Sequence, residues 1–84
     1  MKVHVFKAKL LGYGDNYEGI WFDADCYSKE SAESQFVECT GYTTKANGDS
    51  YPYTYYEYDG KKYYKVYYIG LFDKDNMPRN NYDL

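Results

Sequence analysis

An Asp-Gly pair between two tyrosine-rich runs constrains the fold of this chain more than any other feature. Residues 51–72 hold nine of the fourteen tyrosines, and Asp59-Gly60 lies in the middle of this stretch. A two-residue type I′ turn requires positive φ at both central positions, and Asp-Gly accepts that conformation. The flanking residues have high β-propensity. The sequence therefore predicts a β-hairpin with its turn at Asp59-Gly60.

A two-residue turn also predicts the register of this hairpin. Tyr56 then faces Tyr63, and Glu57 faces Lys62 as a cross-strand pair of opposite charge. Side chains alternate between the two faces of a strand. Val66 favours burial of its own face, whereas two lysines favour exposure of the other. The face that we expect to be exposed carries Tyr56, Tyr58, Lys61, Tyr63, Lys65 and Tyr67.

This aromatic and basic face has two interpretations. Tyrosine offers a large, rigid contact area with a polar tip, so the face can bind a partner. Tyrosine also fits a half-buried pleated surface, and cross-strand tyrosine pairs stabilise a sheet without any partner. The pattern alone leaves both interpretations open.

The segments before the hairpin predict two strands and a helix. Residues 2–11 and 19–26 alternate apolar and polar side chains, which is typical of half-buried strands. Ser28 is a suitable N-cap, and Gly41 is a suitable residue to end the helix. An inward apolar stripe at helical spacing is formed by Ala32, Phe36 and Cys39.

These elements predict an α+β fold in the order β-β-α-β-β, with an antiparallel sheet of about four strands and one helix on one face. Residues 42–45 are a possible start of a further strand, and Asn47-Gly48 is a turn signal. Residues 1–84 are expected to form a single small domain in which 73–84 are a C-terminal tail. Cys26 and Cys39 are expected to be free thiols, because the helix separates them by about 16 Å.

Composition argues against a membrane location. No apolar run approaches the roughly 18 residues that a membrane span needs. Lysines interrupt the N-terminal segment, so it lacks the apolar core of a secretory signal. We therefore expect a cytoplasmic protein that makes no membrane contact.

Acidic residues concentrate in one third of the chain. The net charge is only −3, but residues 14–40 contain seven acidic side chains and a single lysine, Lys29. A localised field of one sign selects partners of the opposite charge. The acidic residues that we assign to partner binding are Asp23, Asp25, Glu30, Glu33 and Glu38.

The sequence offers little for catalysis or for metal binding. His4 is the only histidine, and we expect it at the surface or at an edge and not in a catalytic site. No spacing typical of a zinc site occurs, and no glycine-rich phosphate loop precedes a helix. The pairs Asp23-x-Asp25 and Asp73-x-Asp75 match only a fragment of a calcium-binding pattern. We predict a protein that is not an enzyme and needs no metal or cofactor.

The core of the acidic segment, Gly19-Ile20-Trp21-Phe22-Asp23 followed by a short acidic amphipathic helix, resembles the N-terminal module of the ArdA antirestriction family. The resemblance covers about residues 13–39. It implies a non-enzymatic protein of a mobile element that presents carboxylates to a restriction enzyme in place of DNA phosphates. The chain is shorter than the multi-module members of that family. The matching acids are Asp23, Glu30, Glu33 and Glu38.

The sequence thus leads to one functional hypothesis and two alternatives. The leading hypothesis is a small phage or mobile-element protein of antirestriction or anti-CRISPR type that inhibits a host defence nuclease. Its acidic patch and tyrosine-rich surface would bind a protein partner, either the nuclease or another nucleic-acid-binding effector. One alternative is a single-stranded nucleic-acid-binding module that uses the tyrosines and lysines of the hairpin, although the acidic net charge disfavours it. The other is a structural protein that forms a homodimer through its tyrosine face.

Overall fold

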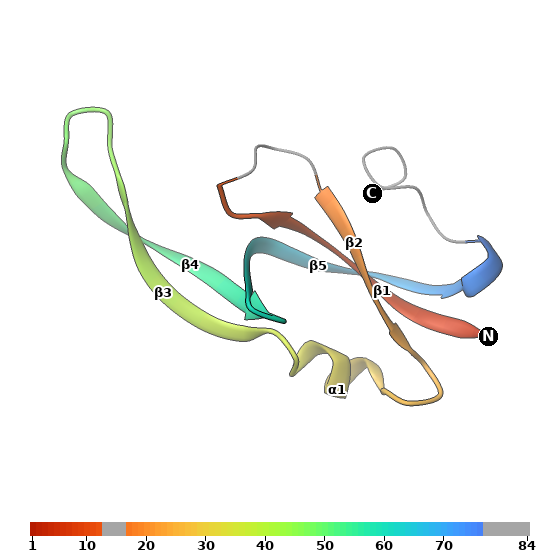
Figure 1. The fold of residues 1–84 in the computed structure, drawn as a ribbon. Helices are drawn as coiled ribbons and strands as arrows, with labels where there is room; N and C mark the ends of the chain where they lie inside the picture. The colour runs from red at the N-terminus through yellow and green to blue at the C-terminus, as the bar shows by residue number, and fades with distance from the viewer. Residues whose placement is uncertain (13–16, 77–84) are drawn as a thin grey trace.

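Five antiparallel strands form one sheet, and a short helix covers part of one face (Figure 1). The computed structural model describes residues 1–12 and 17–76. The strands lie side by side in the order β2-β1-β5-β4-β3. The elements are β1 (Lys2–Leu10), β2 (Tyr17–Asp23), α1 (Lys29–Glu33), β3 (Val37–Thr44), β4 (Ser50–Tyr58), β5 (Lys61–Asp73) and the 3₁₀ turn η1 (Lys74–Asn76).

The predicted α+β class with four strands is wrong. Strands account for 64% of the described residues and helices for 11%, so the fold is a small, mostly β one. The error arises after the helix. Helix α1 ends at Glu33, and β3 begins at Val37. Residues 37–44 are rich in threonine and other residues of high β-propensity, and their pairing with β4 prevails over continuation of the helix.

Cys39 therefore lies in β3 and not on an inward helical stripe. Ala32 and Phe36, the other two members of that stripe, are buried as predicted. Both cysteines are free thiols, with Cys26 exposed and Cys39 half-buried. The Asn47-Gly48 turn is confirmed, because the Gly48 N–H donates to the Lys45 carbonyl in the loop that joins β3 to β4.

The register predicted for the tyrosine hairpin is confirmed for the three pairs next to the turn, whereas the pairs that it predicts further along, Tyr55–Tyr64 and Tyr53–Val66, do not form. β4 and β5 pair through Tyr56 with Tyr63, Glu57 with Lys62, and Tyr58 with Lys61. The turn residues Asp59 and Gly60 have φ of 51° and 75°, as a type I′ turn requires. Beyond these three pairs, β5 leaves β4 and pairs with β1.

Two irregularities in β5 change which side chains share a face. β1 pairs with β5 at Lys9–Tyr64 and at Lys7–Tyr67, so β5 carries one extra residue between these pairs. Lys65 lies within this bulge and has a φ of 54°. Strict alternation therefore fails at this point. Tyr63 shares the helix-covered face with Val66 and Tyr68, while Tyr64 and Tyr67 lie on the opposite face.

Replacing Lys65 with glycine is expected to raise the free energy of unfolding by about 1 kcal/mol. A non-glycine residue at this positive φ is strained by roughly 1–2 kcal/mol, and the greater entropy of glycine in the unfolded chain offsets part of the gain. Urea unfolding measures the change. Lys65→Ala is the control, because it removes the same side chain and retains the strain. Equal effects of the two substitutions would contradict this account.

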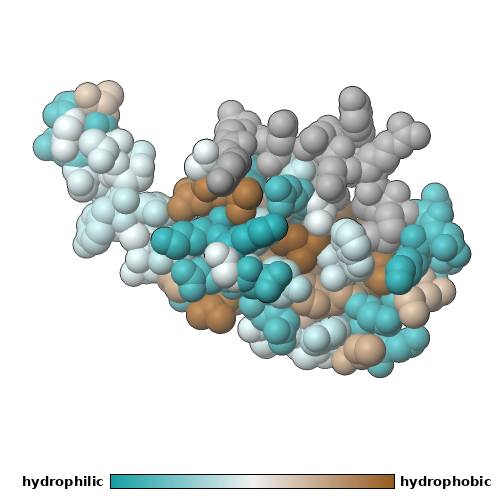
Figure 2. All heavy atoms as spheres, viewed as in Figure 1, coloured by the Kyte–Doolittle hydropathy of each residue, from teal (hydrophilic) through white to brown (hydrophobic). Residues whose placement is uncertain are grey.

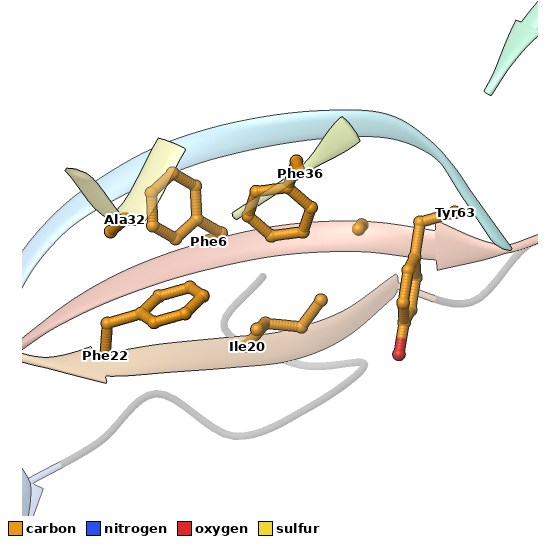
Figure 3. Close-up of a cluster of buried hydrophobic side chains, with 7 residues drawn as sticks. Phe6, Ile20, Phe22, Ala32, Phe36 and Tyr63 are labelled. Carbon is orange, nitrogen blue, oxygen red and sulfur yellow. The ribbon is translucent and has the colours of Figure 1, made fainter. Parts of the chain in front are cut away.

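The core lies between the sheet and the helix segment (Figure 3). Phe6 is 1% exposed, and its ring centre lies 5.2 Å from that of Phe36 and 5.7 Å from that of Phe22. Tyrosines of the hairpin close one end of this cluster. The buried cluster consists of Phe6, Ala8, Ile20, Phe22, Ala32, Phe36 and Tyr63.

His4 is buried, contrary to the prediction of a surface histidine. Its exposed fraction is 7%, and both ring nitrogens have partners. Nε2 lies 3.0 Å from the Tyr27 carbonyl oxygen, and Nδ1 lies 3.1 Å from the Tyr68 hydroxyl. Because a carbonyl only accepts, Nε2–H donates to it, and Nδ1 accepts from Tyr68 in the neutral ring. His4 therefore ties the segment after β2 to the central strands.

The last residues of β3, the first residues of β4 and the loop between them form a two-stranded arm that extends from the body of the protein (Figure 1). We define the arm as residues 40–54. Its side chains are mostly exposed on both faces, and Tyr42 is 74% exposed. Figure 2 shows the arm as a narrow extension near the middle of the hydropathy scale. No helix or second layer of the described chain supports it.

The first residues of the predicted tail, 73–76, belong to regular structure. β5 continues to Asp73, and η1 follows it, while residues 77–84 lie outside the described residues. The carboxylate of Asp73 lies 4.0 Å from Lys2 Nζ, next to the Lys2–Asp73 strand pair. In residues 1–12 and 17–76, no helix has the length and apolar character needed to cross a bilayer.

Candidate protein-binding surfaces

The five acidic residues assigned to partner binding lie within one stretch of the chain, residues 23–38. This stretch runs from the end of β2, through α1, to the start of β3, and it forms the lower border of the view in Figure 1. All but the first are exposed, and Asp23 is half-exposed. We call this set the acidic ridge. It consists of Asp23, Asp25, Glu30, Glu33 and Glu38.

A short helix orders the centre of the acidic ridge. Ser28 is the N-cap, as predicted, and its Oγ accepts a hydrogen bond of 3.1 Å from the Ser31 N–H. Glu30 lies in the first turn, where the unpaired N–H groups favour a negative charge. Ala32 is fully buried and fixes the helix against the sheet. The cap and this contact hold the carboxylates of the helix outward.

Lys29 partly neutralises the acidic ridge. Its Nζ lies 3.7 Å from the Glu33 carboxylate and 4.7 Å from the centre of the Tyr68 ring. No ion pair within 4.0 Å involves Asp25, Glu30 or Glu38 in the part of the chain that the structure describes. These three carboxylates are the groups best placed to meet a positively charged partner.

An aromatic pocket of about 190 Å³ adjoins the acidic ridge. It opens between α1 and β5, close to the point where β4 leaves β5. Among the described residues that line it, Glu33 is the only charged one, so the ridge and the pocket share one carboxylate. The pocket is lined by Phe6, Glu33, Phe36, Tyr56, Val66 and Tyr68.

The aromatic and basic residues predicted for partner binding do not form one surface. Tyr63 is 4% exposed and belongs to the core, and Tyr56 and Tyr58 pack against that core. Lys61 is exposed beside the turn, and Lys65 is exposed in the β5 bulge. Tyr67 is 47% exposed but lies on the opposite face. The bulge separates these residues, and no local sequence signal marks it.

Replacing Tyr63 with phenylalanine is expected to make the protein less sensitive to alkaline unfolding. Burial, followed by the carboxylate of Glu18, raises the pKa of Tyr63 above its usual value of 10.0. Above pH 10 the unfolded chain therefore loses this proton first, and stability falls as pH rises towards the folded pKa. Urea unfolding at several alkaline pH values measures this slope. Tyr67→Phe, which removes the hydroxyl of an exposed tyrosine, is the control.

A second aromatic and basic surface lies on the face of the sheet opposite α1. Lys7 Nζ lies 4.9 Å from the ring centre of Tyr17 and 5.4 Å from that of Tyr67. Lys9 Nζ also lies 4.9 Å from the Tyr17 ring centre. Trp21, which is 57% exposed, lies on the same face through its pairing with β1. The back surface consists of Lys7, Lys9, Tyr17, Trp21 and Tyr67.

Sequence reasoning did not assemble the back surface, although part of its signal is present. Trp21 alternates with Ile20 and Phe22, so its exposure follows from the strand pattern. Its neighbours come from β1 and β5, and their proximity depends on a pairing between distant parts of the chain.

The two Asp-x-Asp pairs have a structural role. Asp23 Oδ1 accepts from the Asp25 N–H at 2.9 Å, and Asp73 Oδ1 accepts from the Asp75 N–H at 3.4 Å. Each first aspartate thus stabilises the turn that follows its strand. Among the described residues, no three or more His, Cys, Asp or Glu side chains gather as a metal ion would require.

Comparisons with known proteins give no match for this chain. No family model matches it, and neither a curated protein nor a solved structure is similar to it. Its candidate surfaces therefore rest on their own geometry.

Proposed function

We propose that this protein is a non-enzymatic inhibitor that binds the nucleic-acid-binding surface of a host defence nuclease through its acidic ridge. The observation that carries the proposal is the exposure of three ridge carboxylates, Asp25, Glu30 and Glu38, which form no ion pair within 4.0 Å among the described residues, on the ridge that adjoins the aromatic pocket. A basic side chain of the partner can lay its aliphatic stem against the aromatic rings and direct its charge to the ridge. The ridge and the pocket together fit an Arg- or Lys-rich protein groove.

The electrostatics of the acidic ridge support this mode of binding. Exposed carboxylates increase the rate of encounter with a basic groove, and salt weakens that effect. Occupation of the groove would exclude nucleic acid. The resemblance of residues 13–39 to the ArdA module fits the same mechanism, with action in the cytoplasm of a host cell and a phage or mobile-element source as parts of the proposal.

The test is DNA cleavage by a purified restriction enzyme of the kind that ArdA proteins inhibit. The variant Glu30→Lys/Glu38→Lys reverses two ridge charges that lack an ion pair. The control Asp49→Lys/Asp75→Lys makes the same change in net charge at exposed sites outside the ridge. Juxtaposed like charges oppose binding by several kcal/mol, so the ridge variant should lose inhibition by more than about tenfold.

The control double variant should inhibit as the native protein does, and inhibition should weaken as salt is raised. Absence of inhibition by the native protein would contradict the proposal for this enzyme class. Equal loss in the two variants would show that net charge, and not the acidic ridge, is responsible.

The back surface favours a second candidate function, the binding of single-stranded nucleic acid. Exposed aromatic rings stack on bases, and each stacked base contributes about 1–3 kcal/mol. Trp21 and Tyr67 are such rings, and Lys65 is exposed on the same strand as Tyr67. The net charge of −3 opposes this function, so it ranks second.

Trp21 is the only tryptophan and reports directly on this second function. Oligo-dT added at low salt should quench its fluorescence, and salt should reverse the change. Tyr67→Ala should weaken that binding by about tenfold. Unchanged emission at low salt would exclude the back surface as a site for single strands.

A further inference from the structure

The outer edge of β3 is a pairing surface that no other strand of the described chain covers. β3 is last in the strand order, and it pairs with β4 along its whole length, from Val37–Glu57 to Thr44–Ser50. An edge strand presents a row of N–H and C=O groups that can pair with a further strand.

The hairpin turn shows which groups of β3 point outward. The residues that flank a two-residue turn, Tyr58 and Lys61, form a hydrogen-bonded pair, and bonded pairs alternate along an antiparallel ladder. The N–H and C=O groups of Tyr56 therefore point to β5, and none of them is available to β3. Glu38 lies opposite Tyr56 on β3, so the N–H and C=O groups of Glu38 point away from β4. The same alternation continues along β3. The outward residues are Glu38, Thr40, Tyr42 and Thr44.

β3 lacks the devices that normally protect an edge. It contains no proline or lysine, and Glu38 is its only charged residue. By contrast, the edge of β4 beyond its contact with β5 carries Pro52, which has no N–H to offer. β2, the edge strand on the other side of the sheet, is shorter and carries Glu18 and Asp23 near its ends. The β3 edge is therefore the open one.

We propose that a second copy of this chain pairs with this edge, β3 against β3 and antiparallel, about a two-fold axis at Gly41. In this register Thr40 faces Tyr42 of the second copy, and Glu38 faces Thr44, so no like charges meet. Sliding one β3 strand by an odd number of residues is excluded, because the outward-pointing N–H and C=O groups of one copy would then lie opposite residues whose groups point to β4. Since Pro52 blocks the other edge of the arm, pairing closes at two copies.

Gly41 suits the axis of this dimer. The ring of its cross-strand partner Tyr53 lies over it, so closely that a Cβ at position 41 would lie 3.0 Å from Tyr53 Oη. Residues with the same number lie on the same face of a two-fold sheet. The two Tyr53 rings therefore come together over two glycines and form an aromatic contact at the centre.

Dimerisation accounts for an arm that is otherwise poorly supported. An isolated two-stranded ribbon has marginal stability in water. Pairing β3 with β3 turns two such ribbons into one of four strands. Tyr42, which is 74% exposed in the single chain, then gains a cross-strand neighbour.

The test measures association of the full chain by sedimentation velocity over a wide concentration range. The native protein should show a concentration-dependent dimer. Tyr42→Pro removes an outward N–H that β4 does not use, and the preceding residue is glycine, which tolerates a following proline. This variant should weaken association by at least about tenfold, because each dimer loses two backbone hydrogen bonds. Tyr42→Thr, which keeps the N–H, is the matched control and should weaken association less.

Hydrogen exchange of the native protein supplies a second measurement that needs no variant. In dilute solution the Thr43 amide should be protected and the Tyr42 amide should not, and at high concentration both should be protected. A protein that stays monomeric, or a dimer that Tyr42→Pro leaves intact, would overturn the proposal. Capture of a foreign extended peptide by a monomeric chain would also overturn it and identify the edge as a peptide-binding one.

Discussion

Replacing Phe6 with alanine is expected to lower the free energy of unfolding by about 3–5 kcal/mol. The ring is 1% exposed, and it contacts the rings of Phe22, Phe36 and Tyr68. These partners come from β2, from the residues between α1 and β3, and from β5. No single neighbour can therefore fill the cavity that loss of the ring would leave. Small domains are stable by only about 5–15 kcal/mol, so the variant should lose a large share of its stability. Urea unfolding in the cold measures the loss.

Leu71→Ala is the matched control for this substitution. Leu71 is 54% exposed on β5, and its truncation should change stability by no more than about 0.5 kcal/mol. Phe6→Leu should give an intermediate loss, because it retains most of the apolar volume. A loss below about 1.5 kcal/mol for Phe6→Ala would show that the ring does not join the three elements as described.

Replacing Gly70 with alanine is expected to cost about 1–3 kcal/mol, through the backbone alone. Gly70 has a φ of 134°, a conformation that side-chain-bearing L residues rarely adopt. A Cβ there would meet only ordinary contact, 3.8 Å from Phe72 Cε2. Gly70 pairs with Val5 at the second register shift of β5, so relief of the strain would disturb the pairing beyond it.

Chemical synthesis offers a direct control for this second substitution. D-alanine favours positive φ and adds the same methyl group, so a chain with D-alanine at position 70 should keep most of the native stability. Equal losses with L- and D-alanine, measured by thermal unfolding, would indicate a steric cause and contradict the backbone explanation.

Local signals in the sequence were sufficient for the hairpin and for the apolar rows of β1 and β2. The Asp59-Gly60 turn specified its own conformation and register, and both are confirmed next to the turn. Phe6 and Ala8, like Ile20 and Phe22, share one buried face as their alternation predicts. The expectation of a half-buried strand is wrong for the first part of β1, because Val3 and Val5 on the opposite face are each 1% exposed.

The sequence could not show where two preferences compete. Residues 34–44 carry a helical stripe and also high β-propensity, and pairing with β4 decides in favour of a strand from Val37. The Lys65 bulge has no local signal, since it arises where β5 passes from β4 to β1. That bulge brings Val66 onto the core face with Tyr63 and places Tyr67 on the opposite face, which divides the predicted aromatic surface. The carboxylates of the acidic ridge needed no such pairing, because they lie in one stretch of the chain, and all but Asp23 are exposed.

The central position of β1 also determines when this protein can fold. Phe6 pairs with Tyr68, 62 positions later in the chain (68 minus 6), whereas most helical proteins form contacts over a few residues. While the chain is synthesised, β1 and β2 are complete well before β5 is made. The apolar side chains around Phe6 therefore stay exposed until β5 can pair with β1. Exposed apolar surface of this kind binds chaperones and aggregates readily. Folding should be complete only after β5 has emerged, and it should be slow for a domain of this size.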